Sequence, residues 1–279
     1  MPSQQEKAAQ FAKMHESGCF ILPNAWDIGS AAVIAEAGFK VIATTSAGVA
    51  FAYGFPDGEF IGRDRMLEIC GEIAQRLPVP VTADLEAGYG SEPSAVAETV
   101  RAAIAAGIVG CNIEDAAAGK LFDFDLSVAR IKAGVAAAKQ AGLPDFVLNA
   151  RTDPYLKRFG TQEQCFDESV RRANAYLAVG AKCAFIPGPS DAASATKLAQ
   201  AIKGPINLSG VLAGTLPPLA EAKKTGVRRI SLGGSLMQAS YGFLRTTMKK
   251  LATDEAAFDY AKDSVGHAEF GALMQKYKA

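Results

Sequence analysis

The feature of this chain that most constrains its fold is a unit, repeated eight times, in which a short apolar run precedes a stretch with helical periodicity. The apolar runs contain few polar residues, as expected for strands that are covered on both faces. In the stretches between them, apolar residues recur three and four positions apart. The runs span residues 19–26, 40–48, 79–90, 109–116, 145–153, 182–188, 205–210 and 228–235.

This alternation predicts the architecture of the chain. Strands that alternate with helices predict a parallel sheet, and eight such units predict closure into a (β/α)8 barrel, the TIM-barrel fold. No Gly-x-Gly-x-x-Gly follows the first run, which disfavours a doubly wound nucleotide-binding sheet. We expect one domain over residues 1–279, with the barrel at about 19–250 and extra helices at about 254–278.

Composition excludes several classes of function. Lys and Arg number 29, and Asp and Glu also number 29, so the balanced charge disfavours nucleic acid as a general partner. No apolar run approaches the ~18 residues of a membrane span, and the polar N-terminus lacks a signal-peptide core. The five cysteines have no Cys-x-x-Cys spacing and are typical of reduced thiols. We therefore expect a cytoplasmic protein without membrane or nucleic-acid partners.

Four acidic residues follow consecutive predicted strands, at the end of the barrel where active sites lie. Asp84 and Glu86 end the third strand, Glu114 ends the fourth, and Asp57 lies in the loop after the second. Carboxylates this close repel one another unless a cation lies between them, and oxygen ligands suit Mg²⁺ or Mn²⁺. The alternative is that the acids are separate helix caps or surface ion pairs.

A single arginine follows the fifth predicted strand. Arg151 can bind a substrate carboxylate through two parallel hydrogen bonds. Alternatively, Arg151 neutralises Glu114 or Glu86 within the barrel wall, and the two roles are compatible.

Small and polar residues follow two further strands. Ser46, Ala47 and Gly48 come after the second strand, where their backbone N–H groups can bind an anion or simply form a tight turn. Asn207 and Ser209 share one face of the seventh strand. We expect them either to contact a substrate or to hydrogen-bond within a layer of the barrel.

Three motifs at the ends of strands three to five have a recognisable pattern. They are Asp84-x-Glu86-Ala-Gly-Tyr-Gly, Asn-Ile-Glu114-Asp115 and Asn-Ala-Arg151-Thr-Asp. Together they resemble the isocitrate lyase/phosphoenolpyruvate mutase superfamily, with a similarity that extends from about residue 22 to residue 236. The resemblance implies a (β/α)8 barrel whose last helix is swapped with a neighbouring subunit, in a homotetramer or a swapped dimer.

The resemblance also implies how the site works. Mg²⁺ would be bound directly by Asp84, and mostly through water by Asp57, Glu86 and Glu114. Members of the superfamily break or form C–C or P–C bonds next to a 2-oxo acid. A divalent cation fits this chemistry, since bond cleavage at C3 leaves an enolate that a Lewis acid stabilises.

The substrate contacts that the resemblance implies come from three elements. The carboxylate of the 2-oxo acid would lie on the backbone of Ser46, Ala47 and Gly48 and on Arg151. Trp26, at the end of the first apolar run, is a further expected substrate-binding residue.

One loop departs from the superfamily pattern. Isocitrate and 2-methylisocitrate lyases carry a catalytic cysteine in a Lys-Cys-Gly-His loop after strand four, and the phosphonate enzymes have a longer loop with an essential asparagine. Residues 116–122 here contain no Cys, His or Asn, and Cys111 lies inside the strand. Lys120 and Tyr53 are the nearest candidates for a catalytic acid or base. The pattern is most similar to the short-loop, lyase-like branch that is often labelled phosphonomutase.

Three functions are compatible with these residues. The first is a Mg²⁺-dependent lyase or hydrolase that acts on a small 2-oxo or 2-hydroxy di- or tricarboxylic acid. The second is a phosphonate mutase or hydrolase, which would need more cationic side chains than Arg151 and Lys120 at the mouth. The third is a non-catalytic barrel that binds a 2-oxo acid.

Overall fold

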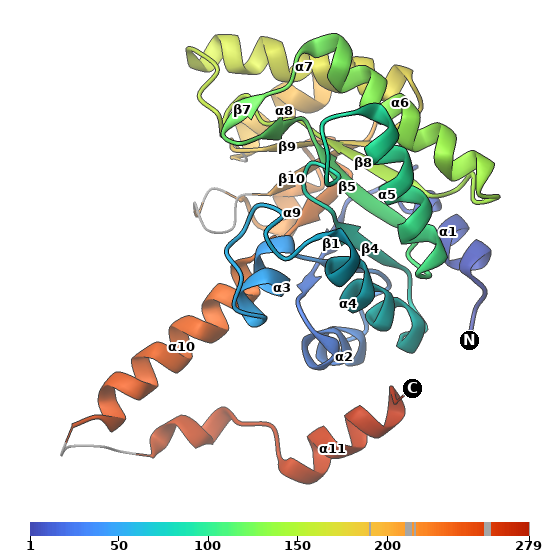
Figure 1. Ribbon diagram of the computed structural model, residues 1–279. Coiled ribbons are helices and arrows are strands. Elements are labelled where there is room, and N and C mark those ends of the chain that lie inside the picture. Colours follow the sequence, from blue (N-terminus) through green and yellow to red (C-terminus); the bar gives the residue numbers. More distant parts are fainter. Residues whose placement is uncertain (190, 210–213, 215, 254–257, 279) are drawn as a thin grey trace.

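Nine short parallel strands form the wall of the barrel (Figure 1). The computed structural model describes residues 1–189, 191–209, 214, 216–253 and 258–278. The order of the strands in the sheet is β1-β11-β10-β9-β8-β5-β4-β3-β2. Their bounds are β1 (Phe20–Leu22), β2 (Asn24–Ala25), β3 (Ile42–Thr44), β4 (Val81–Asp84), β5 (Gly110–Glu114), β8 (Val147–Arg151), β9 (Cys183–Pro187), β10 (Ile206–Ser209) and β11 (Arg229–Ser231).

The barrel closes through its first strand, which Pro23 divides into β1 and β2. On one side β1 pairs with β11, and on the other β2 pairs with β3. Pro23 has no N–H to give to the sheet, but its carbonyl accepts a hydrogen bond from the N–H of Ala43 at 2.9 Å. The two pieces occupy one strand position, so the wall has the eight positions of the predicted (β/α)8 barrel, which is confirmed.

Helices follow the strands and surround the wall in Figure 1. Several begin at a residue whose side chain caps the free N–H groups, such as Asp27, Asp123 and Thr161. Their bounds are α1 (Gln4–Lys13), α2 (Ile28–Glu36), α3 (Ser46–Ala52), α4 (Arg63–Arg76), α5 (Pro93–Ala105), α6 (Phe124–Gln140), α7 (Gln162–Ala178), α8 (Ala192–Ala201), α9 (Leu219–Ala222), α10 (Ser235–Leu251), the 3-10 helix η1 (Asp259–Asp263) and α11 (His267–Lys276).

Helix α1 packs against the barrel through Phe11. The Phe11 ring is fully buried, and Arg229 from β11 lies 5.8 Å from its centre. A Cβ atom at Gly110 in β5 would come within 2.9 Å of the same ring, so only glycine fits at that position. The face of α1 that carries Ala8 and Phe11 is therefore part of the core.

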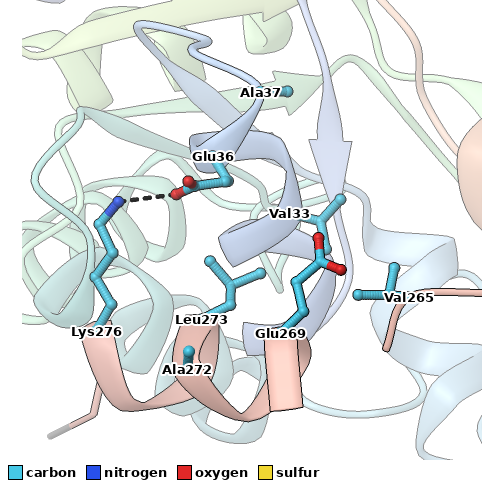
Figure 2. Close-up of a pocket in the computed structure, with 8 residues that line it drawn as sticks. All are labelled: Val33, Glu36, Ala37, Val265, Glu269, Ala272, Leu273 and Lys276. Carbon is cyan, nitrogen blue, oxygen red and sulfur yellow. Dashed lines mark hydrogen bonds and ion pairs between the residues drawn. The ribbon is translucent and has the colours of Figure 1, made fainter. Parts of the chain in front are cut away.

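The C-terminal helices extend beyond the barrel, as Figure 1 shows for α10. The predicted extra helical segment at 254–278 contains η1 and α11, while 254–257 lies outside the described residues. Helix α11 lies against α2 of the same chain, where Lys276 forms an ion pair with Glu36 at 2.8 Å (Figure 2). A pocket of about 490 Å³ lies between these helices and is also lined by Val33 and Leu273.

Two expectations from the sequence concern the cysteines and membrane-spanning helices. All five cysteines are free thiols, as predicted, and only Cys19 is not fully buried. Within the described residues, no helix is long and apolar enough to cross a lipid bilayer.

Candidate active site

A pocket of about 580 Å³ opens at the C-terminal ends of the strands, the end at which active sites of such barrels lie. It collects residues from the loops after β3, β4, β5 and β8. Its lining consists of Ser46, Asp57, Gly58, Glu59, Phe60, Glu86, Ala87, Glu114, Ala116, Ala117, Ala118, Gly119, Arg151 and Lys157. Three of the four predicted metal ligands therefore face one cavity, together with the predicted carboxylate-binding arginine.

Asp84, the fourth predicted ligand, lies beside this lining and is held by hydrogen bonds. The N–H and hydroxyl of Ser46 donate to Asp84 Oδ2 at 3.3 and 2.9 Å. On the other oxygen, Asn112 Nδ2 donates to Asp84 Oδ1 at 3.3 Å. These three donors fix the orientation of the Asp84 carboxylate.

The support for Asp84 continues into the barrel interior. Asn112 Oδ1 accepts hydrogen bonds from Asn149 Nδ2 at 2.6 Å and from Arg229 Nη2 at 3.4 Å. The Arg229 side chain is 0% exposed, and burial lowers its pKa to about 10. Sequence reasoning missed these three residues, although polar side chains inside otherwise apolar strands were a signal that something there needs hydrogen bonds.

Glu86 and Glu114 are buried at the same mouth with less support. In the described part of the chain, the Glu86 carboxylate accepts a long backbone hydrogen bond, from the N–H of Gly58 at 3.4 Å. Burial, together with the neighbouring Asp84 and Asp57 carboxylates, raises the pKa of Glu86 to about 9. Burial also raises the pKa of Glu114 to about 8, against the opposing effect of Arg151.

The donor set of the pocket fits a hard divalent cation. Formal charges in the lining are four carboxylates, Asp57, Glu59, Glu86 and Glu114, against Arg151 and Lys157. Asp84, beside the lining, adds a fifth carboxylate, so the site has an excess of negative charge that favours a bound cation. Within the described residues, no three His, Cys, Asp or Glu side chains converge as a direct ligand set. Mg²⁺ commonly keeps several water ligands and is bound through one or two protein carboxylates.

Arg151 pairs with two carboxylates at the rim. Its Nη1 lies 2.7 Å from Glu114 Oε2, and its Nε and Nη2 lie 2.8 and 2.9 Å from the two oxygens of Asp153. The wall-pairing role considered from the sequence is therefore present. Because Arg151 also lines the pocket, the pairing fixes its planar guanidinium group at the cavity surface.

The Ser46-Ala47-Gly48 segment is the first turn of α3, not an open turn. Thr45 caps this helix, and its hydroxyl accepts from the N–H of Gly48 at 3.4 Å. The N–H of Ser46 already donates to Asp84. The N–H groups that sequence analysis assigned to a substrate thus lie at a helix start, and two of them have protein partners.

Other predicted site residues lie outside the pocket lining. Tyr53 is 44% exposed and its ring packs under Arg65, with 4.9 Å between Arg65 Cζ and the ring centre. Lys120 is exposed on β7 (Lys120–Leu121), which forms a small hairpin with β6 (Ala116–Ala117). Neither residue is brought toward the carboxylates by the fold.

The two polar residues of β10 differ in depth. Asn207 is fully buried, and it exchanges two hydrogen bonds with Ser231, at 3.1 and 3.2 Å. This is the barrel-layer hydrogen bonding that the sequence left open. Ser209 is only half-buried at the strand end. Trp26 packs at the start of α3, where a Cβ on Gly48 would lie 3.0 Å from Trp26 Cβ.

Backbone strain is concentrated near this pocket. Non-glycine residues rarely adopt a left-handed conformation, and they cluster at functional sites when they do. Among the residues that the structure describes, five non-glycine residues have this conformation: Glu59, Glu86, Tyr89, Ala118 and Arg158. All lie in loops that follow β3, β4, β5 and β8, which supports the assignment of this end as the functional one.

Two buried arginines fix the loops beside the acids. Arg130 in α6 donates to the carbonyls of Ala87, Gly90 and Ser91, in the loop after Glu86. Arg172 in α7 donates to the Phe122 carbonyl at 2.9 Å, at the base of the β6–β7 hairpin. The rim of the pocket is thus held by charged groups that lie outside the barrel wall.

A closed parallel barrel with acids and an arginine at its C-terminal mouth defines a member of the isocitrate lyase/phosphoenolpyruvate mutase superfamily, as the motifs implied. Within it, the chain belongs to the phosphoenolpyruvate phosphomutase family, whose model matches residues 11–252. An uncharacterised protein of Mycobacterium tuberculosis is 37% identical over 224 residues, which cover 80% of this chain and 81% of that protein.

Solved structures agree with this assignment. A crystal structure from Burkholderia cenocepacia J2315 superposes with a TM-score of 0.90 at 37% identity, covering 97% of this chain and 96% of that one. An oxaloacetate acetylhydrolase in complex with the product oxalate superposes with a TM-score of 0.85 at 27% identity, covering 98% and 95%. Relatives named for an activity are lyases, a hydrolase and mutases. The chain therefore belongs to a superfamily of enzymes that act on small carboxylic acids.

Proposed function

We propose that this enzyme is a Mg²⁺-dependent lyase or hydrolase that cleaves a C–C bond in a small 2-oxo or 2-hydroxy di- or tricarboxylic acid. The observation that carries the proposal is the pocket that Glu86, Glu114 and Arg151 line, with the hydrogen-bonded Asp84 beside it. Mn²⁺ is an alternative cation because its ligand preferences are similar.

In this proposal each residue has a separate task. Asp84 would hold the cation directly, and Asp57, Glu86 and Glu114 would hold it through water. When bound, Mg²⁺ acts as a Lewis acid toward the enolate that C–C cleavage leaves. Arg151, held in place by Asp153 and Glu114, binds the carboxylate next to the 2-oxo group.

A non-catalytic function has one observation in its favour. The hairpin that covers the pocket contributes only Ala116, Ala117, Ala118 and Gly119 to the lining, so it supplies no group that can transfer a proton. A barrel that binds a 2-oxo acid without converting it would need no such group. The presence of a catalytic acid or base in the pocket therefore distinguishes a lyase or hydrolase from a non-catalytic barrel.

The decisive experiment is an assay of pyruvate release from a panel of 2-oxo acids, malates and phosphonopyruvate, with and without Mg²⁺. We expect Mg²⁺-dependent turnover of a carboxylic acid, and we expect Asp84→Ala to abolish both metal binding and turnover. Asp64→Ala is the matched control, since that carboxylate is 94% exposed. Full Mg²⁺-dependent turnover by Asp84→Ala would show that the metal site is wrong.

The same panel separates the alternatives. Turnover of phosphonopyruvate alone would favour a phosphonate enzyme. Tight binding of oxalate with no turnover of any compound would favour the non-catalytic barrel.

We also propose that the chain forms a homotetramer or a swapped dimer in which the C-terminal helices contact a second copy. Helix α10 exposes large apolar side chains, and burying them against another chain would be favourable. They are Leu236, Tyr241, Phe243, Leu244 and Met248. Light scattering after gel filtration tests this proposal, since Phe243→Glu should dissociate the assembly and a monomeric wild type would refute it.

A further inference from the structure

The pocket contains a second cationic side chain that the motifs do not include. Lys157 lies in the turn that follows β8, and it lines the same cavity as Arg151 and Glu114. Arg151 is committed to two carboxylates, Glu114 and Asp153. Across the part of the chain that the structure describes, Lys157 has no ion-pair partner within 4.0 Å, so its charge is available to a ligand.

The backbone places Lys157 firmly at the rim. Its N–H donates to the Asp153 carbonyl at 2.9 Å, and the N–H of Asp153 donates to Asp115 Oδ1 at 3.0 Å. The turn continues through Arg158, which has a left-handed φ of 51°. Lys157 is therefore attached to the same wall as Arg151, six residues further along the chain.

Among the lining residues, the other cationic side chain, Arg151, is already paired with two carboxylates. The other charged residues of the lining, Asp57, Glu59 and Glu86, are acidic, and the hairpin residues 116–119 are alanines and a glycine. A distal carboxylate that met only these side chains would lose its hydration without gaining a partner, which is costly. Lys157 is the residue of this lining that can compensate that loss.

We propose that Lys157 binds the distal carboxylate of the substrate, so that the site selects a four- or five-carbon 2-oxo diacid over the monoacid of equal length. This inference rests on the proposed function, because it takes the proximal carboxylate to lie on Arg151. Lys157 then acts as a specificity-determining residue that contacts the substrate far from the bond that breaks.

Calorimetric binding with Mg²⁺ present tests the proposal on the intact protein. The probes are oxalate, which has no distal group, and the matched pair 2-oxoglutarate and 2-oxopentanoate. We expect wild type to prefer the diacid by roughly tenfold, the scale of one charged hydrogen bond. Lys157→Gln should remove that preference and leave the affinities for oxalate and 2-oxopentanoate unchanged, while Lys157→Arg should retain it.

Arg158→Gln is the matched control, since it removes a neighbouring positive charge that does not line the pocket. If Arg158→Gln weakened diacid binding as much as Lys157→Gln does, the effect would come from the overall charge, and the proposal would be wrong. The proposal would also be wrong if Lys157→Gln kept the preference for the diacid. The same holds if that variant lost only the binding of phosphonopyruvate. If oxalate does not bind wild type, the proposed function itself fails, and this inference fails with it.

Discussion

Two buried acids at the ends of neighbouring strands have opposite surroundings. Asp115, which follows β5 and is 2% exposed, accepts hydrogen bonds from Thr152, Asp153, Arg172 and Tyr176. Glu86, which follows β4 and is 7% exposed, accepts one long hydrogen bond, from Gly58. Both belong to the motifs that characterise the chain.

The number of hydrogen bonds to each carboxylate distinguishes Asp115, which stabilises the fold, from Glu86, which belongs to the proposed metal site. Burial raises the pKa of Asp115, but hydrogen bonds from Thr152 and Tyr176 oppose that rise. Glu86 lacks such donors, and the nearby acids Asp84 and Asp57 add to the effect of burial. A buried carboxylate with few donors costs free energy, and a bound cation would recover that cost. The hydrogen bonds of Asp115 therefore stabilise the fold, while the surroundings of Glu86 support the proposed metal site.

Removing the Asp115 carboxylate should have the largest effect on stability. Asp115→Ala leaves the Tyr176 hydroxyl without its 2.7 Å partner and Arg172 without one of its two carboxylates. Breaking a buried ion pair costs about 3–5 kcal/mol of unfolding free energy, which urea denaturation measures. Glu86→Gln should change that free energy far less at neutral pH. Equal losses in both variants would remove the distinction between the two acids.

Arg151 pairs with Glu114 and Asp153 at the rim of the pocket. Its replacement should have the next largest effect, on substrate binding. Arg151→Lys cannot hold Glu114, Asp153 and a substrate carboxylate at once, because an ammonium group lacks the planar fork of guanidinium. We expect 2-oxo acid binding to weaken by about 2–3 kcal/mol, the scale of a charged hydrogen bond. Calorimetry with Mg²⁺ and oxalate measures this. Unchanged affinity would restrict Arg151 to pairing within the wall.

The barrel and its acids were predictable because both depend on local order along the chain. Eight repeats of strand and helix dictate closure, and strand ends bring Glu86, Glu114 and Arg151 to one mouth. The division of the first strand at Pro23 was not predicted, since an apolar run does not reveal which neighbours each half pairs with. The depth of Asn207 was left open because alternation gives the face of a residue and not its layer.

Residues whose role depends on tertiary placement escaped prediction. Lys157 lies in a turn, where no periodicity indicates the direction of a side chain, yet it lines the pocket. Lys120 was considered as a catalytic group because it is near Glu114 in sequence, but the hairpin leaves it exposed. Arg229 donates a hydrogen bond to Asn112, from which it is separated by 117 positions in the sequence. Such contacts exist only after the wall has closed.

A further expected effect is a dependence of stability on pH, to which both Glu86 and Glu114 should contribute. The pKa of Glu86 is about 9 in the folded protein against 4.5 for the free side chain. Between these values the folded state binds more protons than the unfolded state, so stability falls as pH rises. Without metal, the unfolding free energy should decrease from pH 6 to pH 8, by at most about 1.4 kcal/mol per pH unit for each such carboxyl.

Urea denaturation in the presence of a chelator measures that slope. Glu86→Gln should flatten it, because glutamine does not titrate, and the remaining slope should come mainly from Glu114, whose pKa is about 8. Saturating Mg²⁺ should reverse the trend, since a cation that displaces these protons binds more tightly as pH rises. Stability of the metal-free protein that increases from pH 6 to pH 8 would mean that Glu86 is ionised and solvated, like an ordinary surface acid.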